Sequence, residues 1–302
     1  MKHPRYILTA IIVLASVSAA QPRVVSIEEL PLGTDRQWQA PRFSPSGNSV
    51  YYTSSGFEGI WKFSLQDRAV SQISDAPGAG FGFSISQDET RIAYRTTTTL
   101  PTQRRTHSVI VQDLRTGSIS VIDSGRDLTA PTITDQAVRY SKAGESESSA
   151  LQVAGNTAEV LGIEQLNIAL QIGPDKKLLD PLGTGRYIWP SLSPDRKLLV
   201  AYQMEQGTFV SDLEGHVLAI LGRRNAPSWS HNGRWIAYMD DRDDGHRILS
   251  SEIMLVSPDG LTTVVLTETP DRIEMNPSCS PTEKKIAFNT LDGRVFLLTY
   301  SE

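Results

Sequence analysis

Cysteine is almost missing from this chain, and long apolar runs and basic clusters are missing as well. The 302 residues include one cysteine, Cys279, so burial and strand pairing must hold the fold without an internal disulfide. Beyond the N-terminus, no segment approaches the length of a membrane-spanning helix. The formal net charge is −5, and Arg104-Arg105 and Arg223-Arg224 are isolated basic pairs. These features argue against a nucleic-acid partner.

A long amphipathic helix is also absent from the sequence. No apolar periodicity of the helical kind extends beyond two turns. Short alternating runs dominate instead, bounded by Gly, Pro, Asp and Asn, with 22 glycines and 17 prolines in total. This pattern is typical of many short strands that form a sandwich, a barrel or a propeller.

The N-terminus has the three parts of a secretory signal. Lys2 and Arg5 supply positive charge, residues 6–17 form a short apolar run, and Ser18-Ala19-Ala20 places small residues at a cleavage position. We therefore expect cleavage near Ala20, a periplasmic or secreted protein, and no stable membrane insertion afterwards. An uncleaved membrane anchor is the alternative. Cleavage would change the net charge from −5 to −7, because residues 1–20 carry two cations and no carboxylate.

One pattern occurs six times along the chain. An apolar residue precedes a serine or threonine, a polar turn follows, and the next strand ends in Tyr or Phe; five copies begin with proline. Pro227-Ser-Trp-Ser-His-Asn-Gly233, followed by Ile236-Ala237-Tyr238, is an example. The serine or threonine anchors are Ser44, Ser86, Thr134, Ser193, Ser230 and Ser280. Their separations, between 37 and 59 residues, are those of propeller blades with four short strands each.

The last repeat is incomplete, and the N-terminus supplies a strand without a partner. After Phe288 only the strand 294–300 remains, whereas Arg23–Leu30 precedes the first repeat. Pairing these two segments would close the ring and remove two exposed sheet edges. The sequence thus predicts an all-β fold, a six-bladed propeller of four-stranded antiparallel blades closed by an N-terminal strand.

The Pro-x-Phe-Ser-Pro-Ser-Gly, Ser-Pro-Asp and Pro-Ser-Trp-Ser-His-Asn-Gly-Arg-Trp-Ile-Ala-Tyr elements resemble the repeat of the TolB-like, WD-repeat-like periplasmic propellers. The resemblance covers nearly all of the chain after residue 20. It implies a periplasmic propeller, but the same repeat also occurs in peptidase propellers and polysaccharide lyases. This sequence shows no N-terminal α/β domain of the TolB kind, because strand repeats begin by about residue 37.

The region from about 141 to 187 is the least regular part of the chain. It contains no anchor, and we interpret it as an insertion; a seventh blade is the alternative. The expected organisation is therefore a signal peptide over residues 1–20 and one propeller domain over residues 21–302.

Catalytic and metal-binding patterns are hard to find. No Gly-x-Ser-x-Gly elbow occurs, and the repeated serines are better explained as turn formers. The histidines after residue 20 are spread over the repeats, so we expect no metal and no cofactor. Asp240–Asp244 is the densest acidic cluster, which we interpret as a solvated turn; bound calcium is the alternative.

Binding by a propeller usually takes place where the loops leading into the innermost strands converge. In this sequence those loops supply aromatic, amide and basic side chains suited to a peptide or a glycan. The candidate binding residues are Trp38, Gln39, Phe81, Tyr187, Trp189, Arg224, Asn225 and Asn276.

The sequence therefore predicts a monomeric, non-catalytic scaffold that binds an envelope protein segment or a glycan. A polysaccharide lyase-like or other metal-dependent propeller enzyme is the alternative.

Overall fold

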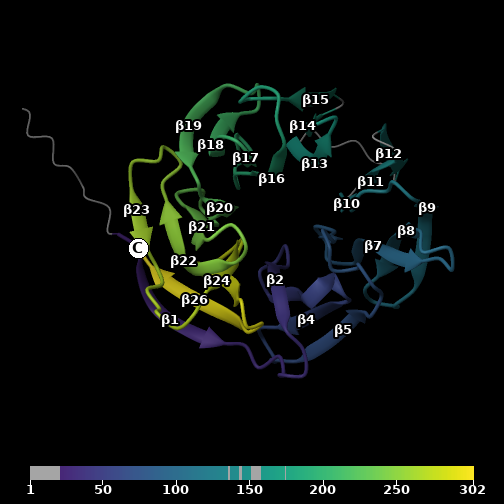
Figure 1. Ribbon diagram of the computed structural model, residues 1–302, viewed down its shortest axis with the longest axis horizontal. Coiled ribbons are helices and arrows are strands. Elements are labelled where there is room, and N and C mark those ends of the chain that lie inside the picture. Colours follow the sequence, from purple (N-terminus) through teal and green to yellow (C-terminus); the bar gives the residue numbers. More distant parts are fainter. Residues whose placement is uncertain (1–20, 135–136, 143–144, 151–157, 174) are drawn as a thin grey trace, which may run out of the picture.

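The computed structural model describes residues 21–134, 137–142, 145–150, 158–173 and 175–302. Its described residues form antiparallel sheets and no α-helix. Seven sheets follow one another around a central axis, as Figure 1 shows. The expected signal peptide, residues 1–20, lies outside the described residues. No helix in the described ranges is long and apolar enough to cross a membrane.

The first three anchored sheets follow one another from residue 38. The first contains β2 (Trp38–Phe43), β3 (Ser49–Ser54), the 3-10 turn η1 (Ser55–Phe57), β4 (Ile60–Ser64) and β5 (Val70–Ser74). The second contains β6 (Ser84–Ile85), β7 (Arg91–Thr99), β8 (Arg105–Asp113) and β9 (Ile119–Gly125). The third contains β10 (Thr132–Ile133), β11 (Ala137–Lys142) and β12 (Glu145–Ala150).

The other three anchored sheets make up the second half of the ring. One contains β16 (Tyr187–Leu192), β17 (Leu198–Gln203), β18 (Gly207–Asp212) and β19 (Val217–Gly222). The next contains β20 (Asn225–Trp229), β21 (Ile236–Asp243), β22 (Ile248–Val256) and β23 (Thr263–Val265). The last contains β24 (Glu274–Cys279), β25 (Lys285–Thr290), β26 (Val295–Ser301) and β1 (Arg23–Glu29).

The N-terminal strand closes the ring as predicted. β1 pairs antiparallel with β26, from Arg23 opposite Ser301 to Glu29 opposite Phe296. The Leu30 N–H extends this pairing by donating to the Val295 carbonyl at 2.8 Å. The outer strand of the last blade therefore comes from the other end of the chain (Figure 1).

Each anchor hydroxyl organises the turn that follows it. The buried Ser230 donates to Asn232 Oδ1 at 2.9 Å and accepts the Trp235 N–H at 3.0 Å. Ser193 makes the same two bonds, to Asp195 Oδ1 at 2.7 Å and from the Leu198 N–H at 2.9 Å. The anchors are therefore turn formers, as the sequence indicates.

Hydrogen bonds join the innermost strands of neighbouring blades in a repeating way. The serine two residues before one anchor accepts the N–H of the residue just before the next anchor. In the described part of the chain, three bonds of this kind run from Ile133 N to Ser84 Oγ (3.1 Å), from Cys279 N to Ser228 Oγ (2.9 Å) and from Phe43 N to Ser278 Oγ (3.2 Å).

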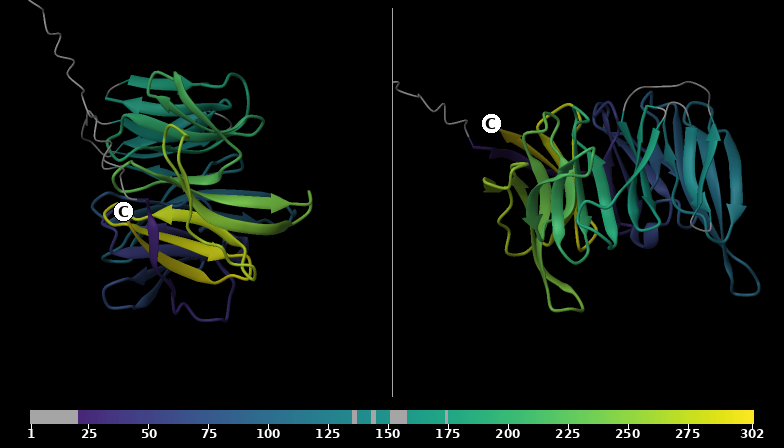
Figure 2. Two further views of the ribbon diagram at one scale, coloured as in Figure 1. Left: turned by 90° about the vertical axis from the view of Figure 1, so that its left-hand side faces the viewer. Right: turned by 90° about the horizontal axis from the view of Figure 1, so that it is seen from above.

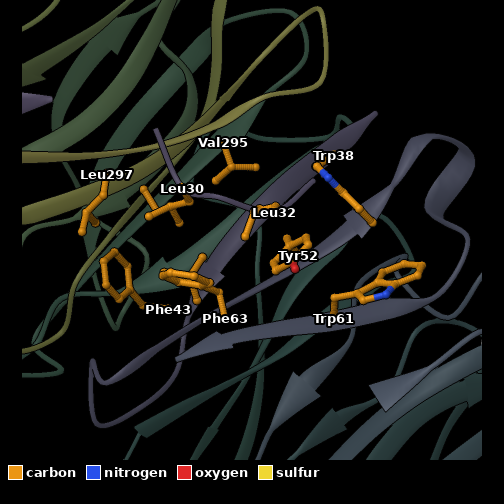
Figure 3. Close-up of a cluster of buried hydrophobic side chains, with 11 residues drawn as sticks. Leu30, Leu32, Trp38, Phe43, Tyr52, Trp61, Phe63, Val295 and Leu297 are labelled. Carbon is orange, nitrogen blue, oxygen red and sulfur yellow. The ribbon is translucent and has the colours of Figure 1, made fainter. Parts of the chain in front are cut away.

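Apolar side chains between neighbouring sheets form the core. Figure 3 shows the cluster between the closing blade and the first anchored sheet, where Leu30, Leu32, Trp38, Val295 and Leu297 pack together. Tyr52, Trp61 and Phe63 complete it, with the Trp38 ring edge-on to both Tyr52 and Trp61. Side chains from the N-terminal segment thus fill the interface beside the closure.

The irregular region forms a sheet of its own. β13 (Ala158–Glu164), β14 (Asn167–Ile172) and β15 (Asp175–Leu179) pair antiparallel between the third anchored sheet and β16–β19. Arg196 lies in the turn after the anchor Ser193 and donates to the Ala158 carbonyl at 2.6 Å, so β13 starts on the face of the ring that carries the anchor turns. The second strand of a regular blade also starts on that face. β13, β14 and β15 therefore run in the directions of the second, third and fourth strands of a blade.

The propeller predicted from the repeat is confirmed, and each of its six anchors begins one sheet of the ring. Of these six sheets, the third has three strands in the described residues. The segment expected as an insertion contributes the additional sheet β13–β15, which packs against β16–β19 as neighbouring blades do.

The closure predicts a difference between the two faces of the N-terminal segment. Leu30 is 3% exposed in the closing cluster, so Leu30→Ala should lower the free energy of unfolding by about 2–5 kcal/mol. Val25, on strand β1 of the same segment, is 65% exposed, and Val25→Ala should change the free energy of unfolding by less than about 0.5 kcal/mol. Urea denaturation of the two variants measures the difference. Equal effects would contradict closure by this segment.

Candidate functional site

One face of the ring gathers the loops that could bind a partner. Strand direction alternates within each blade, so the loop leading into the first strand and the hairpin between the second and third strands lie at the same face of the ring. We call this face of the ring the mouth face. The β7–β8 and β21–β22 hairpins both project from it beyond the rest of the ring (right view of Figure 2).

Most of the exposed apolar side chains lie either on the mouth face or on the outermost strands. Among the described residues, Val25, Val121 and Ile220 exemplify those on outermost strands, and Leu261 lies in a turn of the opposite face. Those on the mouth face are Phe81, Leu100, Leu166, Trp189, Met204, Leu249 and Leu291. These side chains are spread over loops of several blades, so the surroundings of each decide whether it could contribute to a binding site.

Trp189 has a backbone conformation that tryptophan rarely adopts. A β-bulge interrupts the pairing of β16 with β17 between Ile188 and Ser191, and Trp189 has φ +54° immediately before Pro190. Four other residues located four positions before an anchor share a left-handed φ, and they are Ala40, Gly82, Ala226 and Asn276. The bulge therefore belongs to the repeat, whereas a large aromatic at this position is particular to this blade.

The Trp189 ring is 43% exposed and lies edge-on to Tyr202, with ring centroids 5.7 Å apart. It borders a hollow of about 650 Å³ whose other walls come from the β17–β18 turn and the start of β20. Glu205, Gln206, Arg223 and Asn225 supply polar groups there. The hollow thus combines an accessible aromatic ring with one acidic, one basic and two amide side chains.

The acidic cluster of the β21–β22 hairpin bonds to two of the side chains that line this hollow. Arg223 bonds Asp241 Oδ2 at 3.1 Å and also pairs with Asp243 Oδ2, while Asn225 Nδ2 donates to Asp241 Oδ1 at 2.5 Å. The Arg223 guanidinium lowers the pKa of Asp243, and Asp243 raises the pKa of Arg223. Two of the acids interpreted as a solvated turn therefore orient a cation at the mouth face.

Phe81 and Tyr187 border a larger cavity of about 830 Å³ between β10–β12 and β13–β15. The Phe81 ring lies edge-on to Phe57, and the Arg95 guanidinium carbon is 5.5 Å from its centroid. The Tyr187 hydroxyl donates to the Gly183 carbonyl at 2.8 Å, which fixes its ring at the cavity wall. Ile188 and Met204 line both hollows, so the two are adjacent.

The remaining candidates lie elsewhere. Trp38 is only 4% exposed inside the closing cluster, so its ring is not accessible to a ligand. Gln39 donates to the Ser54 carbonyl, and Asn276 to Asn289 Oδ1. Arg224 lies over the Tyr238 ring and reaches Thr263 on the outermost strand β23. Of the eight predicted residues, only Trp189 and Asn225 therefore share the polar hollow.

Arg223 lines the polar hollow but is not among the eight residues predicted from the sequence. In the sequence it is half of an isolated basic pair, because its partners Asp241 and Asp243 lie about 20 positions further along the chain. A signal was available in the strand pattern, since Asp241 and Asp243 alternate on one face of β21 and therefore reach the same neighbour.

The described residues contain no group of three or more His, Cys, Asp or Glu side chains that could hold a metal ion. Glu274 is a buried carboxyl group with 0% exposure on the innermost strand β24. Thr269 Oγ1 donates to its Oε1, while its Oε2 is buried without a hydrogen-bond partner. Burial raises the pKa of Glu274, and the nearby Glu252 adds to the effect. A carboxyl this enclosed is not accessible to a substrate.

Known structures share this propeller fold. TolB from Acinetobacter baumannii matches with a TM-score of 0.55 at 17% identity, over 82% of this chain and 58% of that chain. The β-propeller domain of Cps50 (Swd1) from Myceliophteria thermophila matches with a TM-score of 0.61 at 10% identity, over 93% of this chain and 100% of that domain. The resemblance to TolB-like and WD-repeat-like propellers is thus confirmed for the fold.

Oligogalacturonate lyase from Vibrio parahaemolyticus matches at 13% identity over 86% of this chain and 76% of that chain, with a TM-score of 0.49. A score this low says nothing about chemistry. This chain spans 58% of the TolB chain that it matches. No protein-family model and no curated protein matches the sequence.

The raised pKa of Glu274 predicts how stability depends on pH. A carboxyl group whose pKa is higher in the folded state makes folding less favourable as pH rises above its unfolded value, ordinarily about 4.3. Glu274→Gln should therefore weaken the fall in stability of the wild type above that pH. Urea denaturation between pH 4 and 8 measures it, with the exposed Glu268→Gln as control. Parallel curves for Glu274→Gln and wild type would contradict the assignment.

Proposed function

We propose that this chain is an exported, monomeric, non-catalytic propeller, a single domain over residues 21–302, that binds a protein segment of the cell envelope on its mouth face. The observation that carries the proposal is Trp189, held at a left-handed φ before proline and presented to solvent beside a polar hollow. An exposed aromatic at the rim of a pocket is the kind of residue that dominates binding energy. The corresponding positions in three other blades hold Ala40, Gly82 and Ala226, which offer no comparable contact area.

The charges of the mouth face favour a protein segment over a uniformly acidic glycan. The β7–β8 hairpin carries Arg104 and Arg105 at its tip, whereas the β21–β22 hairpin carries Asp240–Asp244. A partner that bridges the two hairpins needs charges of both signs, which a polypeptide supplies. The acidic hairpin would repel a polyuronate chain, so glycan binding is the second candidate and is tested by the same variants.

Trp189→Ala should weaken retention of the partner by about tenfold or more, because a central aromatic contributes about 2 kcal/mol or more to an interface. Pull-down from an envelope extract with increasing competitor measures retention. Ile220→Ala, an exposed apolar residue on an outermost strand, is the matched control and should retain wild-type binding. Full retention of every saturable partner by Trp189→Ala would overturn the proposed site.

The alternative, a metal-dependent enzyme, gives a different result in elemental analysis. Stoichiometric manganese or zinc in the purified protein, lost when His107 is replaced by alanine, would favour it. His107 Nδ1 lies 3.0 Å from Thr97 Oγ1 on the β7–β8 hairpin, and we expect this side chain to have a structural role.

Export predicts the N-terminus of the mature protein. The positive, apolar and small-residue segments of residues 1–20 support it, as does the fold shared with TolB. Intact-mass measurement of the protein from the periplasmic fraction should give a chain beginning at Gln21. Recovery of the chain in the membrane fraction with residues 1–20 attached would contradict this prediction.

A further inference from the structure

Apolar clusters fill the interfaces between neighbouring sheets almost all the way around the ring. Six such clusters are found in the described residues, and each joins two adjacent sheets. Seven sheets in a closed ring have seven interfaces. The interface between β10–β12 and β13–β15 is the one where the described residues form no such cluster.

A cavity of about 830 Å³ occupies that interface. Thr132, Arg139 and Ser141 line it from the β10–β12 side, and Leu161, Gly162 and Ala169 from the β13–β15 side. A Cβ atom placed on Gly162 would meet no atom within 4 Å, which agrees with open space there. The volume falls within the range of about 300–1,000 Å³ that is usual for small-molecule sites.

Arg139 faces this cavity because of strand alternation. Its neighbours Val138 and Tyr140 pack against the cluster shared with β6–β9, so Arg139 points to the other side of the sheet. Its Nε is buried and has no hydrogen-bond partner. A buried donor without a partner costs about 1–3 kcal/mol, or more when the group is charged, and an anion would satisfy it.

The β13–β15 wall carries an ion pair. Lys176 Nζ lies 2.5 Å from Glu164 Oε2, so these two charges compensate each other at the cavity wall. Arg139 and Arg186 remain as additional cations among the lining residues. Most of the remaining wall is apolar, including Leu161, Ile163 and Ile188.

We propose that this interface is a binding site for a small anion with an apolar body, such as an aromatic or aliphatic carboxylate or sulfonate. The anionic head pairs with the Arg139 guanidinium, and the apolar body packs against lining residues such as Leu161, Ile163 and Ile188. The ligand thereby adds apolar contacts between two sheets whose described residues share no apolar cluster. This site is separate from partner binding at Trp189 and does not depend on it.

Two fluorescent probes of the same shape test the proposal on the mature chain. 1-Anilinonaphthalene-8-sulfonate carries an anionic group, and N-phenyl-1-naphthylamine lacks it. We expect one equivalent of the sulfonate to bind more tightly than the neutral amine. Arg139→Gln should weaken the sulfonate by about tenfold or more and leave the amine within about twofold, because only the charged hydrogen bonds are lost.

Three further variants separate the site from non-specific binding. Ala169→Phe fills the cavity and should weaken both probes. Arg139→Lys keeps the charge and should retain more sulfonate binding than Arg139→Gln, which keeps the test decisive if Ala169→Phe does not fold. Arg115→Gln, in an exposed turn on the opposite face, should match the wild type.

Equal affinity for the two probes, or unchanged sulfonate affinity in Arg139→Gln, would overturn the proposal. Trp189→Ala should bind both probes as the wild type does. Arg139→Gln therefore tests the anion site, and Trp189→Ala tests the partner site, so either proposal can be overturned without the other.

Discussion

Burial between neighbouring sheets is the constraint on which the whole molecule depends. A blade of four short strands has two apolar faces and cannot cover either alone, so each sheet needs a neighbour on both sides. The chain meets this need by pairing β1 with β26, which brings Leu30 and Leu32 against side chains of the last and first blades. Without a disulfide, this pairing is the link that joins the two ends of the ring.

The same packing explains why function concentrates on one face. The innermost strands are joined by serine-to-backbone bonds and the turns after the anchors by serine-to-carboxylate or amide bonds, so these parts are fixed by the repeat. The mouth-face loops differ in sequence and in length from blade to blade. Variation can therefore accumulate there, as in the long β7–β8 and β21–β22 hairpins, without loss of the ring.

The sequence predicted the blades well because their determinants are local. Ser230 and Asn232 lie two residues apart and make the turn between themselves, so the repeat could be recognised without knowing the fold. Ring closure was predictable from an unpaired strand at each end. The additional sheet β13–β15 was read as an insertion because it has no anchor, and its packing against β16–β19 depends on contacts such as Leu170 with Leu199 that no local pattern reveals.

The candidate site was only partly predictable, for a geometric reason. Trp38 and Trp189 both precede an anchor proline, yet one is buried and the other exposed. The left-handed bulge lies four residues before the anchor, so Trp189 occupies it, whereas Trp38 precedes it by two residues and points into the core. In three of the five blades with this left-handed residue, the position holds Ala or Gly, and nothing in the sequence of the Trp189 blade alone marks a bulge.

The irregular sector lies directly beside the hollow at Trp189. β13–β15 follow the strand directions of the second to fourth strands of a blade. At the interface that they share with β10–β12, the described residues line a cavity and form no apolar cluster. The cavity meets the Trp189 hollow at Ile188 and Met204, so both open onto the same loops. Strand β16 borders both spaces through Ile188, and the same strand carries the bulge that presents Trp189. Packing in the irregular sector therefore bears directly on the side chain most suited to bind a partner.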